Sequence, residues 1–133
     1  MSQENVERLR RGYEHLIATG DFPDENFDAD FVWDMSTFHG WPEQQTYLGV
    51  EGARQFMADW TSAWDDWELE VEDYIDAGDR VVAIVRQRGR SKPTGVLVEM
   101  HFGQVWTTRG GQGIRMQMYA SPAEALEAAG LSE

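Results

Sequence analysis

The chain has 133 residues, of which 24 are Asp or Glu and 11 are Lys or Arg, so its net charge is −13, and it has no cysteine. This acidic balance argues against nucleic acid and anionic membranes as partners, because both select basic surfaces. The missing cysteines exclude disulfides, thiol nucleophiles and cysteine metal sites. No apolar run approaches the roughly 20 residues of a membrane span, and the N-terminus lacks signal-peptide features, so we expect one cytoplasmic domain over residues 1–133.

The first segment has the pattern of an amphipathic helix that begins at Ser2 and ends at Gly20. Its apolar residues recur at helical spacing and share one face. Tyr13 is the one polar group in that apolar stripe. Its hydroxyl therefore either points into a cavity or is tied to a partner at the edge of the core.

An acidic run over residues 21–34 follows, but it lacks the central Gly and distal Glu of a calcium loop. Its end overlaps a short strand, Phe31 to Met35, that opens into a loop containing His39. Desolvation beside Trp33 could raise the pKa of Asp34 and suit it as a general base. The alternative is a hydrated or capping aspartate. His39 is either a mobile acid near a pocket mouth or simply solvated.

A second helix is predicted after Tyr47, with a broad apolar stripe that ends at Trp60 and Trp64. Apolar residues then alternate with acids from Trp67 to Glu72, which predicts a strand with one acidic face. Near the C-terminus, a capping box that begins at Ser121 predicts a short final helix.

Residues 80–119 read as three antiparallel strands, because β-branched runs alternate there with glycine-marked turns. A first turn about Lys92-Pro93 would place Arg86 opposite Glu99 and Ile84 opposite His101. One sheet face is then nearly all apolar and needs helices to cover it. The other face is mixed in character. It must meet solvent or a second copy, which predicts a homodimer in which Arg86, Glu99, His101 and Arg115 pair across the sheets.

The order of these segments resembles the SnoaL-like branch of the nuclear-transport-factor-2-like superfamily over nearly the whole chain. Tyr47-Leu-Gly-Val-Glu-Gly52 and Glu124-Ala-Leu-Glu-Ala-Ala-Gly-Leu131 carry most of the resemblance. It implies the α+β fold class: a cone-shaped α+β barrel, in which a strongly curved antiparallel sheet wraps around N-terminal helices and an apolar pocket. Members include ketosteroid isomerases, polyketide cyclases, epoxide hydrolases and proteins without catalysis, so the fold alone does not select a function.

The same resemblance suggests roles for four residues. Tyr13 matches the oxyanion-holding tyrosine of the isomerases, and Asp34 lies within about one position of their base. Gln104 is the nearest counterpart of a protonated aspartate on the sheet. His101 is available for a cyclase-like pairing, although a lone histidine on the mixed face is more often a surface or interface residue.

No histidine pair has a metal-ligand spacing and no glycine-rich phosphate loop follows a strand, so we expect neither a metal nor a cofactor. Three hypotheses remain: cofactor-free acid–base catalysis on an apolar cyclic carbonyl compound, binding of a hydrophobic small molecule without catalysis, and a dimeric scaffold with a filled interior. The predicted ligand-binding residues are Trp33, Met57, Trp60, Met100, Phe102, Trp106, Met116 and Met118.

Overall fold

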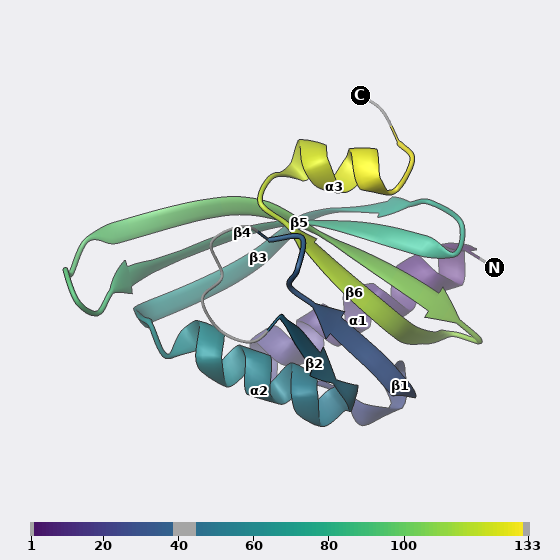
Figure 1. Ribbon diagram of the computed structural model, residues 1–133, viewed down its shortest axis with the longest axis horizontal. Coiled ribbons are helices and arrows are strands. Elements are labelled where there is room, and N and C mark those ends of the chain that lie inside the picture. The colour runs from purple at the N-terminus through teal and green to yellow at the C-terminus, as the bar shows by residue number, and fades with distance from the viewer. Residues whose placement is uncertain (1, 39–44, 132–133) are drawn as a thin grey trace.

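A computed structural model describes residues 2–38 and 45–131, and Figure 1 shows its helices packed on both sides of one curved sheet. Along the chain the elements are α1 (Ser2–Thr19), the 3-10 turn η1 (Asp24–Asn26), β1 (Phe27–Asp34), β2 (Thr46–Leu48), α2 (Gly49–Thr61), β3 (Trp64–Asp76), β4 (Arg80–Ser91), β5 (Leu97–Arg109), β6 (Gln112–Tyr119) and α3 (Pro122–Ala128). None of the described helices combines the length and hydrophobicity needed to cross a bilayer.

The strands form a single sheet in the order β2-β1-β6-β5-β4-β3. All neighbouring strands run antiparallel except β1 and β6, which are parallel. The sheet is curved and does not close, since β2 and β3 remain as its edges. The predicted α+β class with a strongly curved sheet is confirmed.

The pairing of β4 with β5 differs from the predicted register by two residues. Arg86 lies opposite His101 and Ile84 opposite Gly103, because the turn is centred one residue further along the chain than Lys92-Pro93. The backbone N–H of Ser91 donates to the carbonyl of Val96 at 2.9 Å and closes this turn. Side chains alternate between faces with a period of two, so a two-residue shift leaves every side chain on its predicted face.

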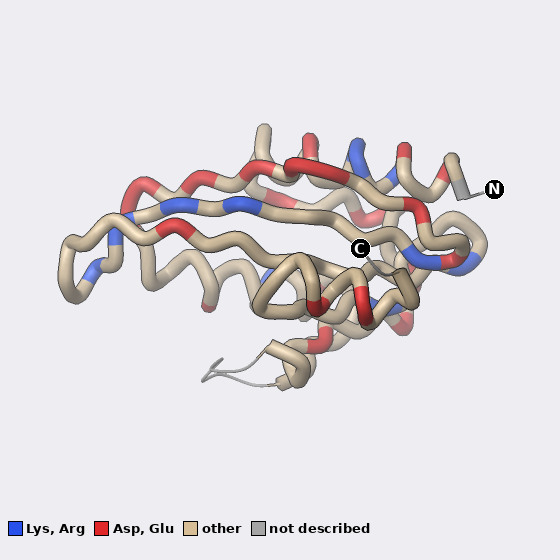
Figure 2. Tube along the Cα trace, turned by 90° about the horizontal axis from the view of Figure 1, so that it is seen from above, with Lys and Arg blue, Asp and Glu red and all other residues tan. Residues whose placement is uncertain are grey.

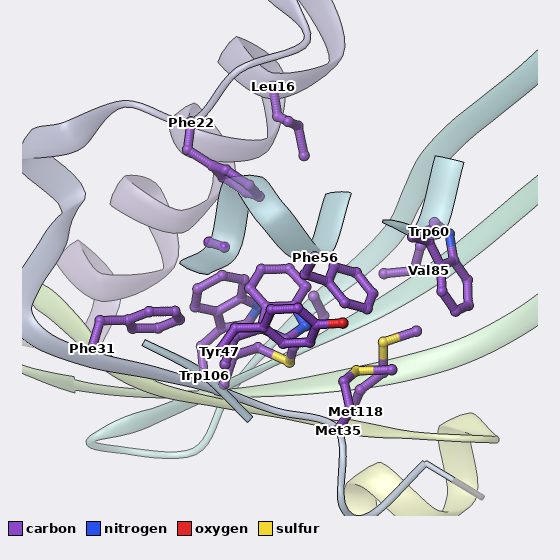
Figure 3. Close-up of a cluster of buried hydrophobic side chains, with 14 of the residues drawn as sticks. Leu16, Phe22, Phe31, Met35, Tyr47, Phe56, Trp60, Val85, Trp106 and Met118 are labelled. Atoms are coloured by element: carbon purple, nitrogen blue, oxygen red, sulfur yellow. The ribbon is translucent and has the colours of Figure 1, made fainter. Parts of the chain in front are cut away.

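Helices α1 and α2 cover the concave face of the sheet and bury the main core with it (Figure 3). Aromatic rings dominate this core. Trp33 stacks on Phe56 with ring centroids 4.6 Å apart, and Phe56 in turn stacks on Trp60 at 5.5 Å. Trp64, which the sequence placed on the second helix, instead begins β3, because the helix ends at Thr61.

Helix α3 packs on the convex face, the one that the sequence left to solvent or to a second copy (Figure 1). There Ala125 and Ala129 cover Val82, Ile84 and Val105. The helix begins as predicted, with the Ser121 hydroxyl accepting a hydrogen bond from the backbone N–H of Glu124 at 3.2 Å.

The rest of the convex face is charged, and Figure 2 shows acidic positions running along one strand beside basic positions on the next. Glu72 of β3 accepts from Arg86 at 2.7 Å, and Arg88 lies 3.8 Å from Glu99. These side chains therefore pair within one sheet. Homodimer formation through this face stays a prediction.

Docking of α3 requires a glycine at position 103. A Cβ atom built on Gly103 would collide with the side chain of Ala125, whereas one built on Gly113 of the neighbouring strand would make ordinary contacts of 3.6 Å or more. We expect Gly103→Ala to lower the free energy of unfolding by about 1–3 kcal/mol through overpacking, and the control Gly113→Ala to lower it by less. Urea denaturation measures both, and equal losses would contradict this account of α3.

Candidate ligand cavity

A small space, which we call the inner cavity, lies between the concave face and helices α1 and α2. Its volume is about 20 Å³, room for roughly one water molecule. It is smaller than the ring-sized pocket that the sequence led us to expect, because the aromatic rings pack against each other. Its walls are formed by Tyr13, Leu16, Phe22, Trp33, Phe56, Met57, Trp60, Trp67, Leu69, Val85, Gln87, Phe102, Gln104, Trp106 and Met118.

Three predicted site residues meet at one end of the inner cavity. The Tyr13 hydroxyl donates a hydrogen bond to Oε1 of Gln104, and Nε1 of Trp106 donates to the Tyr13 oxygen at 3.0 Å. Burial is the largest effect on the Tyr13 pKa and raises it, outweighing the hydrogen bond from Trp106, which lowers it. Tyr13 is therefore a neutral donor at physiological pH.

A second buried amide, Gln87, lies on the same face of the sheet. Its Oε1 accepts hydrogen bonds from Nε1 of Trp60 at 2.7 Å and from Nε1 of Trp67 at 2.9 Å. Its Nε2 faces the sulfur of Met100 at 3.5 Å, just as Nε2 of Gln104 faces a methionine sulfur at 3.7 Å. Thioether sulfur is a weak acceptor, so both amide N–H groups are poorly satisfied.

Trp33 carries the one buried side-chain donor of the described chain that has no hydrogen-bond partner at all. The residue is 2% exposed and lines the inner cavity, with its ring stacked on Phe56. Buried donors without partners are rare in folded proteins, and each one calls for an explanation.

Asp34 is not part of the inner-cavity wall. Trp33 projects into the core from β1, and Asp34, the next residue, accepts instead from Nη2 of Arg115 at 2.6 Å and from the backbone N–H of Ser36 at 2.8 Å. Desolvation acts to raise the pKa of this carboxyl, but the hydrogen bonds from Ser36 and Arg115 together lower it below its usual value. Of the two alternatives that the sequence left open, the lowered pKa and the hydrogen bond from Ser36 favour a capping aspartate over a general base.

His101 lies on the convex face, away from Tyr13 and Gln104. Its Nε2 is 2.7 Å from Oε1 of Glu72, and the side chain is 43% exposed. The structure therefore brings together Tyr13 and Gln104 but neither Asp34 nor His101. His39, the loop histidine considered above, falls outside the described residues.

Most of the predicted ligand-binding residues line the inner cavity, namely Trp33, Met57, Trp60, Phe102, Trp106 and Met118. Met100 contacts Gln87 from behind the cavity wall, and Met116 is fully buried without lining it. The sequence analysis missed Gln87. Continuing the alternation of Val81, Ala83 and Val85 by one step would have placed it on the apolar face.

This arrangement can donate hydrogen bonds but has no evident group to accept a proton. Within the described part of the chain, no Asp, Glu, His, Lys or Arg lines the inner cavity. A general base must lie within hydrogen-bond reach of the proton that it removes. The cavity can therefore bind a hydrogen-bond acceptor atom among its aromatic rings.

Comparison with solved structures identifies several proteins of the same fold. TerC, crystallised with polyporic acid, is 21% identical with a TM-score of 0.72, and the match covers 96% of this chain and 98% of TerC. A proposed SnoaL-like polyketide cyclase from Jannaschia sp. CCS1 is 24% identical with a TM-score of 0.70, over 96% of this chain and 91% of that one. An NTF2-like protein of unknown function from Burkholderia pseudomallei K96243 is 17% identical with a TM-score of 0.71, over 93% and 95% of the two chains.

At the level of sequence, no curated protein matches the chain. A family model described as the SnoaL-like domain matches residues 9–116, which span the chain from α1 to β6. Strand order, helix placement and family model agree, and the chain belongs to the SnoaL-like domain family.

Proposed function

We propose that this protein binds an apolar small molecule that carries a hydrogen-bond-accepting oxygen, and that it does so without converting the ligand. The observation that carries the proposal is the unpartnered Nε1 of Trp33, a residue that lines the inner cavity. A buried donor without an acceptor costs about 1–3 kcal/mol. A ligand oxygen that accepts from Trp33 would recover this free energy.

The other polar groups of the inner cavity select for the same ligand chemistry. Oε1 of Gln87 and Oε1 of Gln104 already accept hydrogen bonds, so the cavity offers few free acceptors. Their Nε2 groups face only methionine sulfur. A carbonyl or ether oxygen is therefore favoured as the ligand atom, and a ligand hydroxyl finds little to receive its proton.

Binding requires the inner cavity to enlarge, because about 20 Å³ does not hold a ring. Met57 and Met118 form part of its wall, and unbranched thioether side chains rearrange more readily than aromatic rings. The relation to TerC, crystallised with polyporic acid, supports small-molecule binding on this fold and says nothing further about the ligand of this chain.

Binding without conversion is favoured over acid–base catalysis by the position of Asp34. Its carboxylate is held by Arg115 and Ser36 outside the cavity wall, and its pKa is lowered. Tyr13 resists deprotonation, because burial raises its pKa. Neither group is suited to remove a proton from a ligand in the inner cavity.

The role of Trp33 is tested with a ketone and its parent hydrocarbon. We expect the wild-type protein to bind indanone more tightly than indane. Trp33→Phe should weaken the affinity for indanone about tenfold, since one hydrogen bond is worth about 1 kcal/mol or more. The affinity for indane should be unaffected. Titration calorimetry gives the affinities. Trp64→Phe, which changes a tryptophan outside the inner cavity, is the control. Failure of both compounds to bind would favour the filled scaffold, and a product detected by mass spectrometry would favour catalysis.

The unpartnered donor also makes a prediction that needs no ligand. Trp33→Phe and Trp60→Phe remove the same atoms from the core, but only the second breaks a hydrogen bond, the one to Gln87. We expect Trp60→Phe to lower the free energy of unfolding by about 1 kcal/mol more than Trp33→Phe. Urea denaturation compares them, and the reverse order would show that Nε1 of Trp33 has a partner.

Asp34→Asn tests whether this carboxylate stabilises the fold. Asparagine keeps an acceptor for Ser36 but loses the charge that faces Arg115, so we expect a loss of about 1–3 kcal/mol at neutral pH. Because the folded pKa lies below the ordinary value of 3.8, the contribution is fully present above that pH and is lost as pH falls through the lowered pKa. The difference in the free energy of unfolding between wild type and variant should therefore be constant from about pH 5 to 8 and disappear below about pH 4.

The control for this experiment is Asp30→Asn, at an exposed position on the same strand, which should change stability little. Indanone affinity should be the same in Asp34→Asn as in the wild type. A variant that is as stable as the wild type but has lost indanone binding would instead place Asp34 in the site.

A further inference from the structure

A second space, which we call the outer pocket, lies beside α1 on the flank nearest η1 and the β5–β6 turn. Its walls are mostly apolar and include Leu9, Phe27 and Val81, and the enclosed part measures about 50 Å³. Four residues line both this pocket and the inner cavity: Tyr13, Leu16, Phe22 and Trp106. Arg8, which lines the outer pocket, is exposed to solvent.

One side of the mouth of the outer pocket is basic, whereas Glu4 and Asp79 line the hollow on its other side. Arg8, Arg11 and His15 follow one another at three- and four-residue spacing on α1 and therefore share one side of the helix. All three line a hollow of about 430 Å³ that adjoins the pocket, where Glu25 is the one acid among the described lining residues.

Among the described residues, no carboxylate lies within ion-pair distance of the two arginines at this mouth. Eight of the eleven Lys and Arg residues lie within ion-pair distance of a carboxylate. Within the described part of the chain, the three that do not are Arg8, Arg11 and Lys92. With acids in excess two to one, an arginine without a carboxylate is unexpected, and two of the three such residues stand at one pocket.

Arg8 is held at the boundary between apolar pocket and solvent. Its guanidinium lies against the backbone of Gly111 in the β5–β6 turn, so closely that a Cβ atom at Gly111 would overlap it. It lines the outer pocket and the adjoining hollow together. A guanidinium in this position can donate hydrogen bonds to an anion whose apolar part lies in the pocket.

We infer that the outer pocket is a second binding site, one that takes a soluble anionic amphiphile: a small apolar body against Leu9 and Trp106, with a carboxylate or sulfonate on Arg8 and Arg11. The two spaces share part of their apolar walls, but the two arginines that would bind the anionic group do not line the inner cavity. The net charge of −13 disfavours an anionic membrane as the source of such a group, so the partner is a free small molecule.

Two fluorescent probes with the same ring system separate charge from hydrophobic contact. Anilinonaphthalene sulfonate is anionic, and phenylnaphthylamine is its neutral counterpart. We expect the wild-type protein to bind the sulfonate more tightly. Arg8→Gln should weaken the sulfonate about tenfold, the size expected for loss of a charge-assisted hydrogen bond at a partly exposed site, and should change phenylnaphthylamine less than twofold.

Lys92→Gln is the matched control, because it removes the same charge from another unpaired position, in the β4–β5 turn far from the pocket along the chain. It should leave both affinities unchanged, and Arg8→Lys should give an intermediate loss of the sulfonate. Equal losses of sulfonate affinity in Arg8→Gln and Lys92→Gln would show that only net charge matters, and would contradict the proposed site. So would a sulfonate affinity that Arg8→Gln does not alter, or equal losses of both probes. Arg8 does not line the inner cavity, so Arg8→Gln should leave indanone binding unchanged, which keeps this test separate from that of the inner cavity.

Discussion

The burial of two glutamine side chains on the concave face is the constraint on which the interior of this protein depends. Gln87 and Gln104 are 1% and 6% exposed, and a buried amide must find partners or destabilise the fold. Tyr13 supplies one from α1, Trp60 supplies one from α2, and Trp67 supplies one from β3. These directional hydrogen bonds orient the helices on the sheet, in addition to the hydrophobic contacts that hold them there. Apolar packing alone would leave their positions less well defined.

The same constraint decides what the inner cavity can recognise. Each amide oxygen accepts from a tyrosine or tryptophan, which leaves the amide N–H groups to face methionine sulfur. Tryptophan can donate a hydrogen bond but cannot accept one, so a cavity lined by many tryptophans has more hydrogen-bond donors than acceptors. Nε1 of Trp33, which has no hydrogen-bond partner, shows this excess of donors most clearly. An acceptor oxygen from outside the chain is the simplest group that corrects it.

The sequence predicted those features that depend on periodicity. Strand alternation placed the side chains of β4 and β5 on the correct faces of the sheet. The turn between these strands is centred one residue away from its predicted place, but the resulting register shift of two residues preserves the faces. Features that depend on contacts between distant segments were not predictable. The cover that α3 provides for Ile84 and Val105 depends on a glycine at position 103, and nothing in a heptapeptide helix indicates which face of a sheet it will meet.

Asp34 shows why the position of a residue in the sequence does not determine the environment of its side chain. Its place at the end of a buried strand was visible in the sequence, and burial does act to raise its pKa. Its pKa is nevertheless lowered, by hydrogen bonds from the nearby Ser36 and from Arg115, a residue 81 positions away that arrives through the parallel pairing of β1 with β6. A carboxylate held in this way keeps its negative charge and fixes the end of β1. The polar side chains that line the inner cavity are neutral, and among the described residues none of them is an Asp, Glu or His that could remove a proton.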